Sequence, residues 1–293
     1  MSRAVSPDDV VARWLAVVVL VFAATALTYR SNGLALEPRG LVGIAAGEGA
    51  LLVLQAYAAL RKLARVQDVA RWAFWGVLVS TLYAVPMYAL AHRAVAFHDE
   101  GLRHADGWLG VDVAAIAHWV RARPWADGAS IAAYQSLPLG CIAALVVPSL
   151  AGAPEATRTM LVALGLASFL TLAVYGVFRG VGPWIGYAGL APTAEQAACG
   201  DLCRALAGGA RFVVDVQRPD PLIAFPSWHT ILAALAAAAL ARVRFLGPVA
   251  CAWGAAVALS TVTTGWHYAV DTVAGLVLAG GCWAAARAIL RAR

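Results

Sequence analysis

Long apolar segments separated by short polar ones run along the whole chain. A helix of about 20 apolar residues is long enough to cross the hydrocarbon core of a membrane. Eight segments fit this pattern, at residues 12–29, 41–60, 70–91, 131–152, 160–178, 223–241, 247–263 and 268–289. The pattern therefore predicts an all-α, polytopic membrane helix bundle of about eight spans, with a range of six to eight, in one domain over residues 1–293.

Two longer polar regions, at 92–130 and 179–222, interrupt this pattern. They contain too few apolar residues to cross a membrane. The stretch DVAAIAHWVRAR at 112–123 has apolar residues at roughly helical spacing with arginine between them, which favours a helix lying in the membrane interface. We therefore expect interfacial helices in these regions.

Composition and charge place the chain in a membrane with a defined orientation. Hydrophobic residues make up 62% and charged residues 13%, whereas a soluble domain is about 25% charged. The termini and the short loops predicted on their side hold 12 of the 22 lysines and arginines, so this side is expected to be cytoplasmic. A bacterial inner membrane fits this arrangement, with the long polar regions facing the periplasm or a lumen. The net charge of +6 favours anionic lipid surfaces over nucleic acid as a partner.

Candidate chemistry begins at WHYAVD, where His267 and Asp271 lie four residues apart. On a helix this spacing puts both side chains on one face. The carboxylate can then accept the proton of one imidazole nitrogen and leave the other free to act as a nucleophile. The alternative is a solvated ion pair at a helix end.

A second polar interruption, FPSWHT at 225–230, places a serine and a histidine where an apolar stretch begins. Pro226 suits the start of a helix, and Ser227 with the first free amides can bind phosphate oxygens. His229 can stand beside them as a proton donor. The alternative is an N-capping serine with an interfacial aromatic pair.

Two arginines upstream are candidate phosphate ligands. Arg211 and Arg218 have six residues between them, and Pro219 follows the second. Guanidinium groups match phosphate oxygens in a planar fork. The alternative is that both are solvated or touch lipid headgroups.

Taken together, these motifs resemble the type 2 phosphatidic acid phosphatase superfamily, over about residues 175–290. That family carries the elements Lys-x6-Arg-Pro, Pro-Ser-x-His and Ser-Arg-x5-His-x3-Asp. The corresponding residues in this chain are Arg211-x6-Arg218-Pro219, Pro226-Ser227-Trp228-His229 and Ser260-Thr261-x5-His267-x3-Asp271. The resemblance implies a six-helix phosphatase-type core, a phosphohistidine formed on His267, and catalysis without a metal or other cofactor.

Thr261 departs from the family pattern, because the phosphatases have arginine there. A monoester phosphate is close to a dianion and a diester is a monoanion, so the loss of one guanidinium suits a diester better. In this respect the chain is similar to the inositol phosphorylceramide synthase branch. DGWLGVD at 106–112 also resembles that branch, and FRGVGPW at 178–184 resembles it more loosely.

The resemblance implies a lipid phosphotransferase. It would move a phosphorylated headgroup from a phospholipid donor to a lipid alcohol such as ceramide or diacylglycerol. A phosphatase acting on phosphatidic acid or a polyprenyl diphosphate is the alternative, and a non-catalytic phospholipid carrier is a further one. No pattern in the sequence specifies an oligomeric state.

Further residues are candidates for a substrate pocket. They are Arg179, Trp228, Thr261, Trp266, Tyr268, Asp106, Asp112 and Glu48. The stretch FHDEGLRHAD at 97–106 could offer a metal site, although a solvated loop is the expected reading, so no metal ligand is assigned. Cys199 and Cys203 are either a short disulfide or two free thiols.

Overall fold

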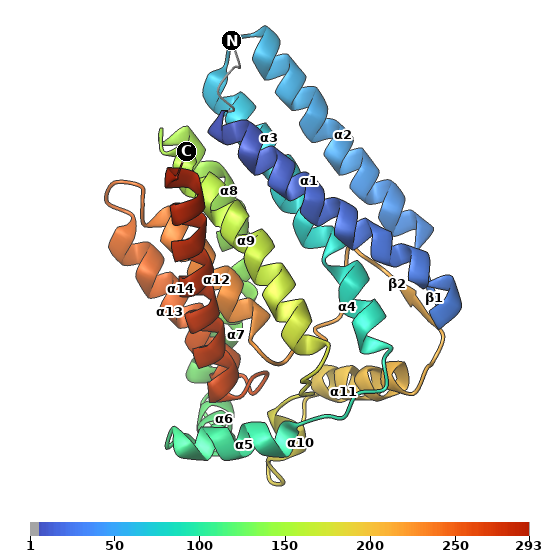
Figure 1. The fold of residues 1–293 in the computed structure, drawn as a ribbon. Coiled ribbons are helices and arrows are strands. Elements are labelled where there is room, and N and C mark those ends of the chain that lie inside the picture. The colour runs from blue at the N-terminus through green and yellow to red at the C-terminus, as the bar shows by residue number, and fades with distance from the viewer. Residues whose placement is uncertain (1–5, 293) are drawn as a thin grey trace.

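The computed structural model describes residues 6–292, and these residues form a helical bundle (Figure 1). The apolar patterning explains why helices dominate, since only helices and closed barrels satisfy the backbone within a membrane. The long helices are α1 (Pro7–Thr25), α2 (Pro38–Leu60), α3 (Ala64–Leu82), α8 (Leu137–Leu150), α9 (Pro154–Tyr175), α12 (Trp228–Leu240), α13 (Gly247–Thr263) and α14 (Ala269–Arg291). The shorter ones are α4 (Ala84–Ala91), α5 (Asp99–Trp108), α6 (Val113–Arg121), α7 (Pro124–Gln135), α10 (Pro183–Gly186) and α11 (Ala194–Ala207), with 3-10 turns η1 (Ala26–Thr28) and η2 (Arg30–Asn32).

Within residues 6–292, five helical segments are long and apolar enough to cross a membrane, as the hydrophobic pattern predicted. They are Pro7–Thr28, Pro38–Leu60, Ala64–Ala91, Pro154–Tyr175 and Ala269–Arg291. A sixth is formed by α7 and α8 together, which meet at a bend of 41°. This confirms the polytopic all-α bundle at the lower end of the expected range.

The other two predicted spans, α12 and α13, are not among these long segments. α13 begins and ends as predicted, at Gly247 and Thr263, whereas α12 is shorter than the sequence suggested. The prediction of 223–241 becomes α12, which starts only at Trp228 because Pro226 and Ser227 precede it and Ser227 caps it. At 1.5 Å per residue, its 13 residues reach about 20 Å, against a hydrocarbon core of about 30 Å. The segment from 219 to 227 is therefore not helical and leads into the start of α12.

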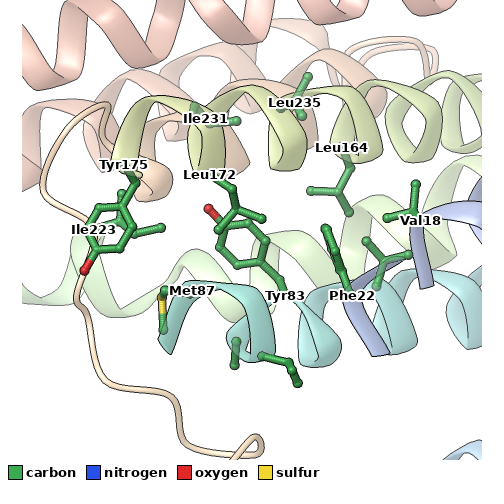
Figure 2. Close-up of a cluster of buried hydrophobic side chains, with 14 of the residues drawn as sticks. Val18, Phe22, Tyr83, Met87, Leu164, Leu172, Tyr175, Ile223, Ile231 and Leu235 are labelled. Carbon is green, nitrogen blue, oxygen red and sulfur yellow. The ribbon is translucent and has the colours of Figure 1, made fainter. Parts of the chain in front are cut away.

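The core of the bundle packs α1, α3 and α4 against α9. Figure 2 shows Phe22 and Tyr83 pointing toward Leu164 and Leu172 of α9. The Phe22 and Tyr83 rings meet edge to face, with centroids 6.0 Å apart, a preferred aromatic geometry. Because α12 also packs against α9, this core holds the helix that carries His229 in a fixed place.

The long polar regions fold back as short helices at one end of the bundle. Helices α5, α6, α10 and α11 gather at the end opposite the two chain termini (Figure 1). The helix expected at 112–123 is present as α6. A two-stranded parallel sheet that the sequence pattern did not predict joins β1 (Leu34–Leu36) to β2 (Phe212–Val214). It ties the region before α12 to the start of α2.

Thiol labelling in a cysteine-free background tests the orientation. Ala151 lies in the turn between α8 and α9, at the end of the bundle near the termini, and Ala188 lies beyond α10 at the other end; both are exposed. Because the basic loops favour the cytoplasm, Ala188→Cys in intact cells should react with a membrane-impermeant maleimide. Ala151→Cys should react only after the cells are permeabilised. The opposite pattern would place the end of the bundle that carries α5, α6, α10 and α11 on the cytoplasmic side.

Candidate active site

Two histidines far apart in the sequence line one pocket. The pocket has a volume of about 170 Å³ and lies where the start of α12, the turn between α13 and α14 and the end of α3 meet. We call it the catalytic pocket. Its lining residues are Ser80, Tyr83, Ala84, Met87, Tyr134, Val181, Pro219, Asp220, Pro221, Leu222, Ile223, Ala224, Trp228, His229, Trp266 and His267. The ring centroids of His229 and His267 are 6.1 Å apart.

The turn that carries His267 is fixed by the end of α13. Gly265 takes a left-handed φ of +78°, which ends the helix as glycine commonly does. The amides of Trp266 and His267 then donate to the carbonyl of Thr261, at 3.1 and 3.0 Å. Thr261 therefore helps to position the histidine through its backbone.

His267 is oriented by two acceptors on the same ring nitrogen. Nδ1 lies 2.9 Å from the carbonyl oxygen of Ala224 and 3.5 Å from Oδ2 of Asp271. Bonding at Nδ1 leaves Nε2 as the nitrogen available for chemistry. Burial lowers the pKa of His267 to about 4, so the imidazole is neutral at neutral pH. A neutral imidazole is the form that can attack an electrophile.

His229 is held by an aromatic residue on α7. Its ring stacks on that of Tyr134, with centroids 4.3 Å apart and planes 19° from parallel. The Tyr134 hydroxyl lies 3.4 Å from Nδ1 of His229. These contacts fix the plane of the imidazole and leave Nε2 as its second site for proton transfer.

Buried carboxylates hold the N-terminus of α14, where Asp271 lies. Oδ2 of Asp271 accepts a hydrogen bond from the amide of Tyr268 at 2.8 Å, and Asp106 accepts one from the amide of Val270 at 2.8 Å. The Tyr268 hydroxyl donates to Asp99 at 3.0 Å. Negative charge is favourable at a helix N-terminus, where amides have no intrahelical partners. Asp106 and Tyr268 thus support the His267 turn and do not line the catalytic pocket.

Ser227 caps α12 and lies outside the pocket lining. Its hydroxyl accepts from the amide of Thr230 at 3.3 Å, and its own amide donates to the carbonyl of Asp271 at 3.0 Å. The side chain is fully buried. Ser227 therefore links the two histidine-bearing turns, and the amides of Trp228 and His229 become the candidates for phosphate contact.

The two motif arginines do not line the catalytic pocket. Arg211 and Arg218 are both exposed, and the Arg211 side chain passes close to Gly33 before β1. Arg218 directly precedes Pro219, which does line the pocket. Of the two, Arg218 lies at the rim, and Arg211 belongs to the edge of the small sheet.

A family model described as the PAP2 superfamily matches residues 100–285. The chain belongs to this superfamily. No curated protein and no solved structure matches it. The matched region contains both pocket histidines and Asp271, the carboxylate next to His267. It begins earlier than the catalytic part of about 175–290 that the motifs indicated. Members of the PAP2 superfamily are phosphatases, which supports an enzyme and leaves the branch of the family open.

In this PAP2 superfamily protein, Arg179 clamps two helix ends. It is 1% exposed, and its guanidinium donates to the carbonyls of Leu90, Ala91 and Arg93 at the end of α4. It also donates to the carbonyl of Tyr175, the last residue of α9. A cation is favourable at a helix C-terminus. Arg179 is therefore engaged in the fold and does not stand in for the arginine that Thr261 replaces.

Three other candidates, Thr261, Asp112 and Glu48, do not line the catalytic pocket. The Thr261 hydroxyl is buried and bonds Thr272 at 2.8 Å and the carbonyl of Ala258 at 2.7 Å. Asp112 caps α6 through the amide of Ala115. Glu48 of α2 is buried, and its carboxylate oxygens have no hydrogen-bond partner among residues 6–292. Trp228 and Trp266, by contrast, do line the pocket.

The acidic stretch and the cysteines also have defined places. Among the described residues, no three His, Cys, Asp or Glu side chains gather in a geometry for a metal ion. Asp99 instead accepts from the amides of Val181 and Gly182. Cys199 and Cys203 are free and buried in α11. The thiol of Cys199 donates to the carbonyl of Pro221, a residue of the pocket wall, at 3.4 Å.

Several pocket residues were missed by the sequence motifs. Tyr134 comes from α7, and Tyr83 comes from the junction of α3 and α4, before the matched region. Tyr83 stacks on Trp228, with ring centroids 4.3 Å apart, and its buried hydroxyl has no partner within the described part of the chain. In the sequence, Tyr83 and Tyr134 are simply aromatic residues within apolar stretches. Residues that only pack in a core show the same pattern, so the sequence could not single these two out.

Replacement of Arg179 tests its role as a clamp. Arg179→Gln leaves several buried carbonyls without a charged donor, and hydrogen bonds to charged groups contribute about 1.5–3 kcal/mol to stability. We expect a lower midpoint of thermal unfolding in detergent. Arg61→Gln, at an exposed arginine after α2, is the control and should leave the midpoint unchanged. Equal midpoints for both variants would contradict the clamp.

Proposed function

We propose that this protein is a metal-independent lipid phosphotransferase that moves a phosphorylated headgroup from a phospholipid donor to a lipid alcohol. The observation that carries the proposal is the pairing of His229 and His267 across one pocket. Membership of the PAP2 superfamily supports chemistry on a lipid phosphate at this pair. The finer assignment, transfer in place of hydrolysis, rests on the charge of the pocket.

In the first half of the reaction, Nε2 of His267 attacks the phosphorus atom of the donor. The bond from phosphorus to the lipid oxygen breaks, and His229 gives its proton to that oxygen. Ala224 and Asp271 hold the Nδ1 side of His267 and stabilise the positive charge that forms on the ring. The product is a phosphohistidine and a free lipid alcohol.

In the second half, an acceptor hydroxyl attacks the phosphohistidine. Its proton passes to His229, and the bond between phosphorus and Nε2 breaks. His267 returns to its neutral form, and His229 is again protonated for the next cycle. The amides of Trp228 and His229, at the start of α12, would hold the free phosphate oxygens in both halves. Arg218 at the rim would attract the anion to the mouth.

The charge of the pocket favours a diester donor. Within residues 6–292, no lysine or arginine lines the catalytic pocket, and Asp220 adds a carboxylate to its wall. A monoester dianion has one more negative charge to neutralise than a diester monoanion, so a pocket with few cations disfavours it more strongly. Thr261, buried against Thr272, supplies no charge in place of the family's arginine.

Hydrolysis of a lipid phosphate is the second candidate, and superfamily membership favours it. Water would then replace the lipid alcohol in the second half, and the same two histidines would act in the same order. The two reactions differ in the acceptor and in the charge of the preferred substrate, so product analysis separates them.

Substitution of the two histidines tests the shared chemistry. His267→Ala and His229→Ala should each lower kcat by at least about 10²-fold, the contribution of a positioned acid or base, in the presence or absence of EDTA. Phosphoenzyme trapped with labelled substrate should disappear in His267→Ala. His118→Ala, at an exposed histidine on α6, is the control. Activity within a few fold of the parent in either pocket variant would exclude that histidine.

Product analysis tests transfer against hydrolysis. With headgroup-labelled phospholipid and a lipid alcohol acceptor, the label should move to the acceptor with little inorganic phosphate released, because the cation-poor pocket favours a diester. Phosphatidic acid should be a poor substrate. Rapid phosphate release from phosphatidic acid or a polyprenyl diphosphate, with no transfer product, would refute the transferase and support the phosphatase.

A further inference from the structure

A second cavity lies directly inward from the catalytic pocket. It has a volume of about 250 Å³ and is lined by residues of α3, α8, α9 and α12. We call it the inner chamber. Apart from Ser80 and Cys141, its lining is made of apolar side chains and one glycine, and it includes Gly76, Leu145, Leu164, Leu232 and Ala236.

The inner chamber continues the catalytic pocket along two helices. Ser80 lines both spaces. On α12, His229 lines the pocket and Leu232, three residues later, lines the chamber, so the two side chains lie one turn apart on one face. On α3, which runs in the opposite sense, Gly76 lies one turn before Ser80. Both helices therefore lead from the histidines into the apolar interior.

The residue shared by the two spaces is accessible. Ser80 is an exposed residue of a helix long enough to span a membrane. Gly76 is buried where a Cβ would come within 2.7 Å of Leu145, so α3 and α8 approach closely just inward of Ser80. Gly76, Ser80 and Leu145 all line the inner chamber, so a hydrocarbon chain that enters beside Ser80 would lie against apolar side chains.

We propose that the inner chamber binds the end of the hydrocarbon tail of the lipid whose phosphate reacts at His267. The inference rests on the proposed function, since it takes the phosphate to lie between the two histidines. A phospholipid joins a charged phosphate to an apolar chain, and these two connected spaces offer one environment for each. Each methylene buried in an apolar site strengthens binding by roughly fourfold. Ser80 marks the point where the tail passes from one space to the other.

A series of lipid substrates of increasing tail length tests this inference. For the parent protein, kcat/KM should rise by up to roughly fourfold per methylene and then level off when the chamber is full. Ala236→Phe narrows the chamber, so kcat/KM should fall by at least about tenfold for long tails and by clearly less for short ones. Leu232→Ala enlarges the chamber, and the plateau should move to longer tails.

The control is Ala256→Phe, the same substitution at an exposed position on α13; the ratio of long-tail to short-tail activity should stay at the parent value. Equal losses for all tail lengths in Ala236→Phe, with an unmoved plateau in Leu232→Ala, would overturn the chamber while leaving the proposed function intact. If the parent acts on no lipid phosphate of any length, the proposed function itself fails. If Ala236→Phe does not fold, Leu232→Ala alone tests the chamber: a plateau at longer tails supports it, and an unmoved plateau overturns it.

Discussion

Buried carboxylates at the N-terminus of α14 organise the catalytic end of the molecule. Asp99, Asp106 and Asp271 are each less than 5% exposed, and burying a carboxylate is costly unless hydrogen-bond donors surround it. The free amides that begin α14 and the hydroxyl of Tyr268 supply such donors. Satisfying these groups requires α5, the loop before α10 and the α13–α14 turn to meet at one place. His267 lies in the α13–α14 turn, so the hydrogen bonds that hold the start of α14 also fix the position of His267.

The polar groups near the pocket divide into those that support the fold and those that face the ligand. Arg179, Ser227 and Thr261 each have their hydrogen-bonding groups engaged by backbone or neighbouring side chains. Tyr134 and Ala224 contact Nδ1 of His229 and His267 respectively, which leaves Nε2 of each ring for the proposed chemistry. This division explains how a site for an anion can have so few cations in its wall. In the proposed reaction the helix-end amides of Trp228 and His229 hold the anion, while Arg218 stays at the rim and Arg179 belongs to the frame of the fold.

The sequence predicted the architecture and the paired histidines, but not the walls around them. Apolar length is a local property, so most spans could be read directly from the sequence. The expected closeness of His267 and Asp271 is also found, but not on one helix face: His267 lies in the turn before α14, and Asp271 lies in the first turn of that helix. Tyr134 and Tyr83 come from other helices, and no spacing rule connects them to His229. Arg179 and Asp106 were expected in a pocket because they lie in the stretches 178–184 and 106–112, which resemble the inositol phosphorylceramide synthase branch. In the structure both side chains bind helix ends: Arg179 donates to carbonyls at the end of α4, and Asp106 accepts from an amide at the start of α14.

One wall of the catalytic pocket comes from outside the matched family region. That region begins at residue 100, whereas Ser80, Tyr83, Ala84 and Met87 belong to α3, α4 and their junction. A fragment cut at the family boundary would retain both histidines and Asp271 but would leave the pocket open on one side, with the Trp228 ring stripped of its stacking partner. A segment with the complete pocket must therefore begin before Ser80, whereas the family match begins at residue 100.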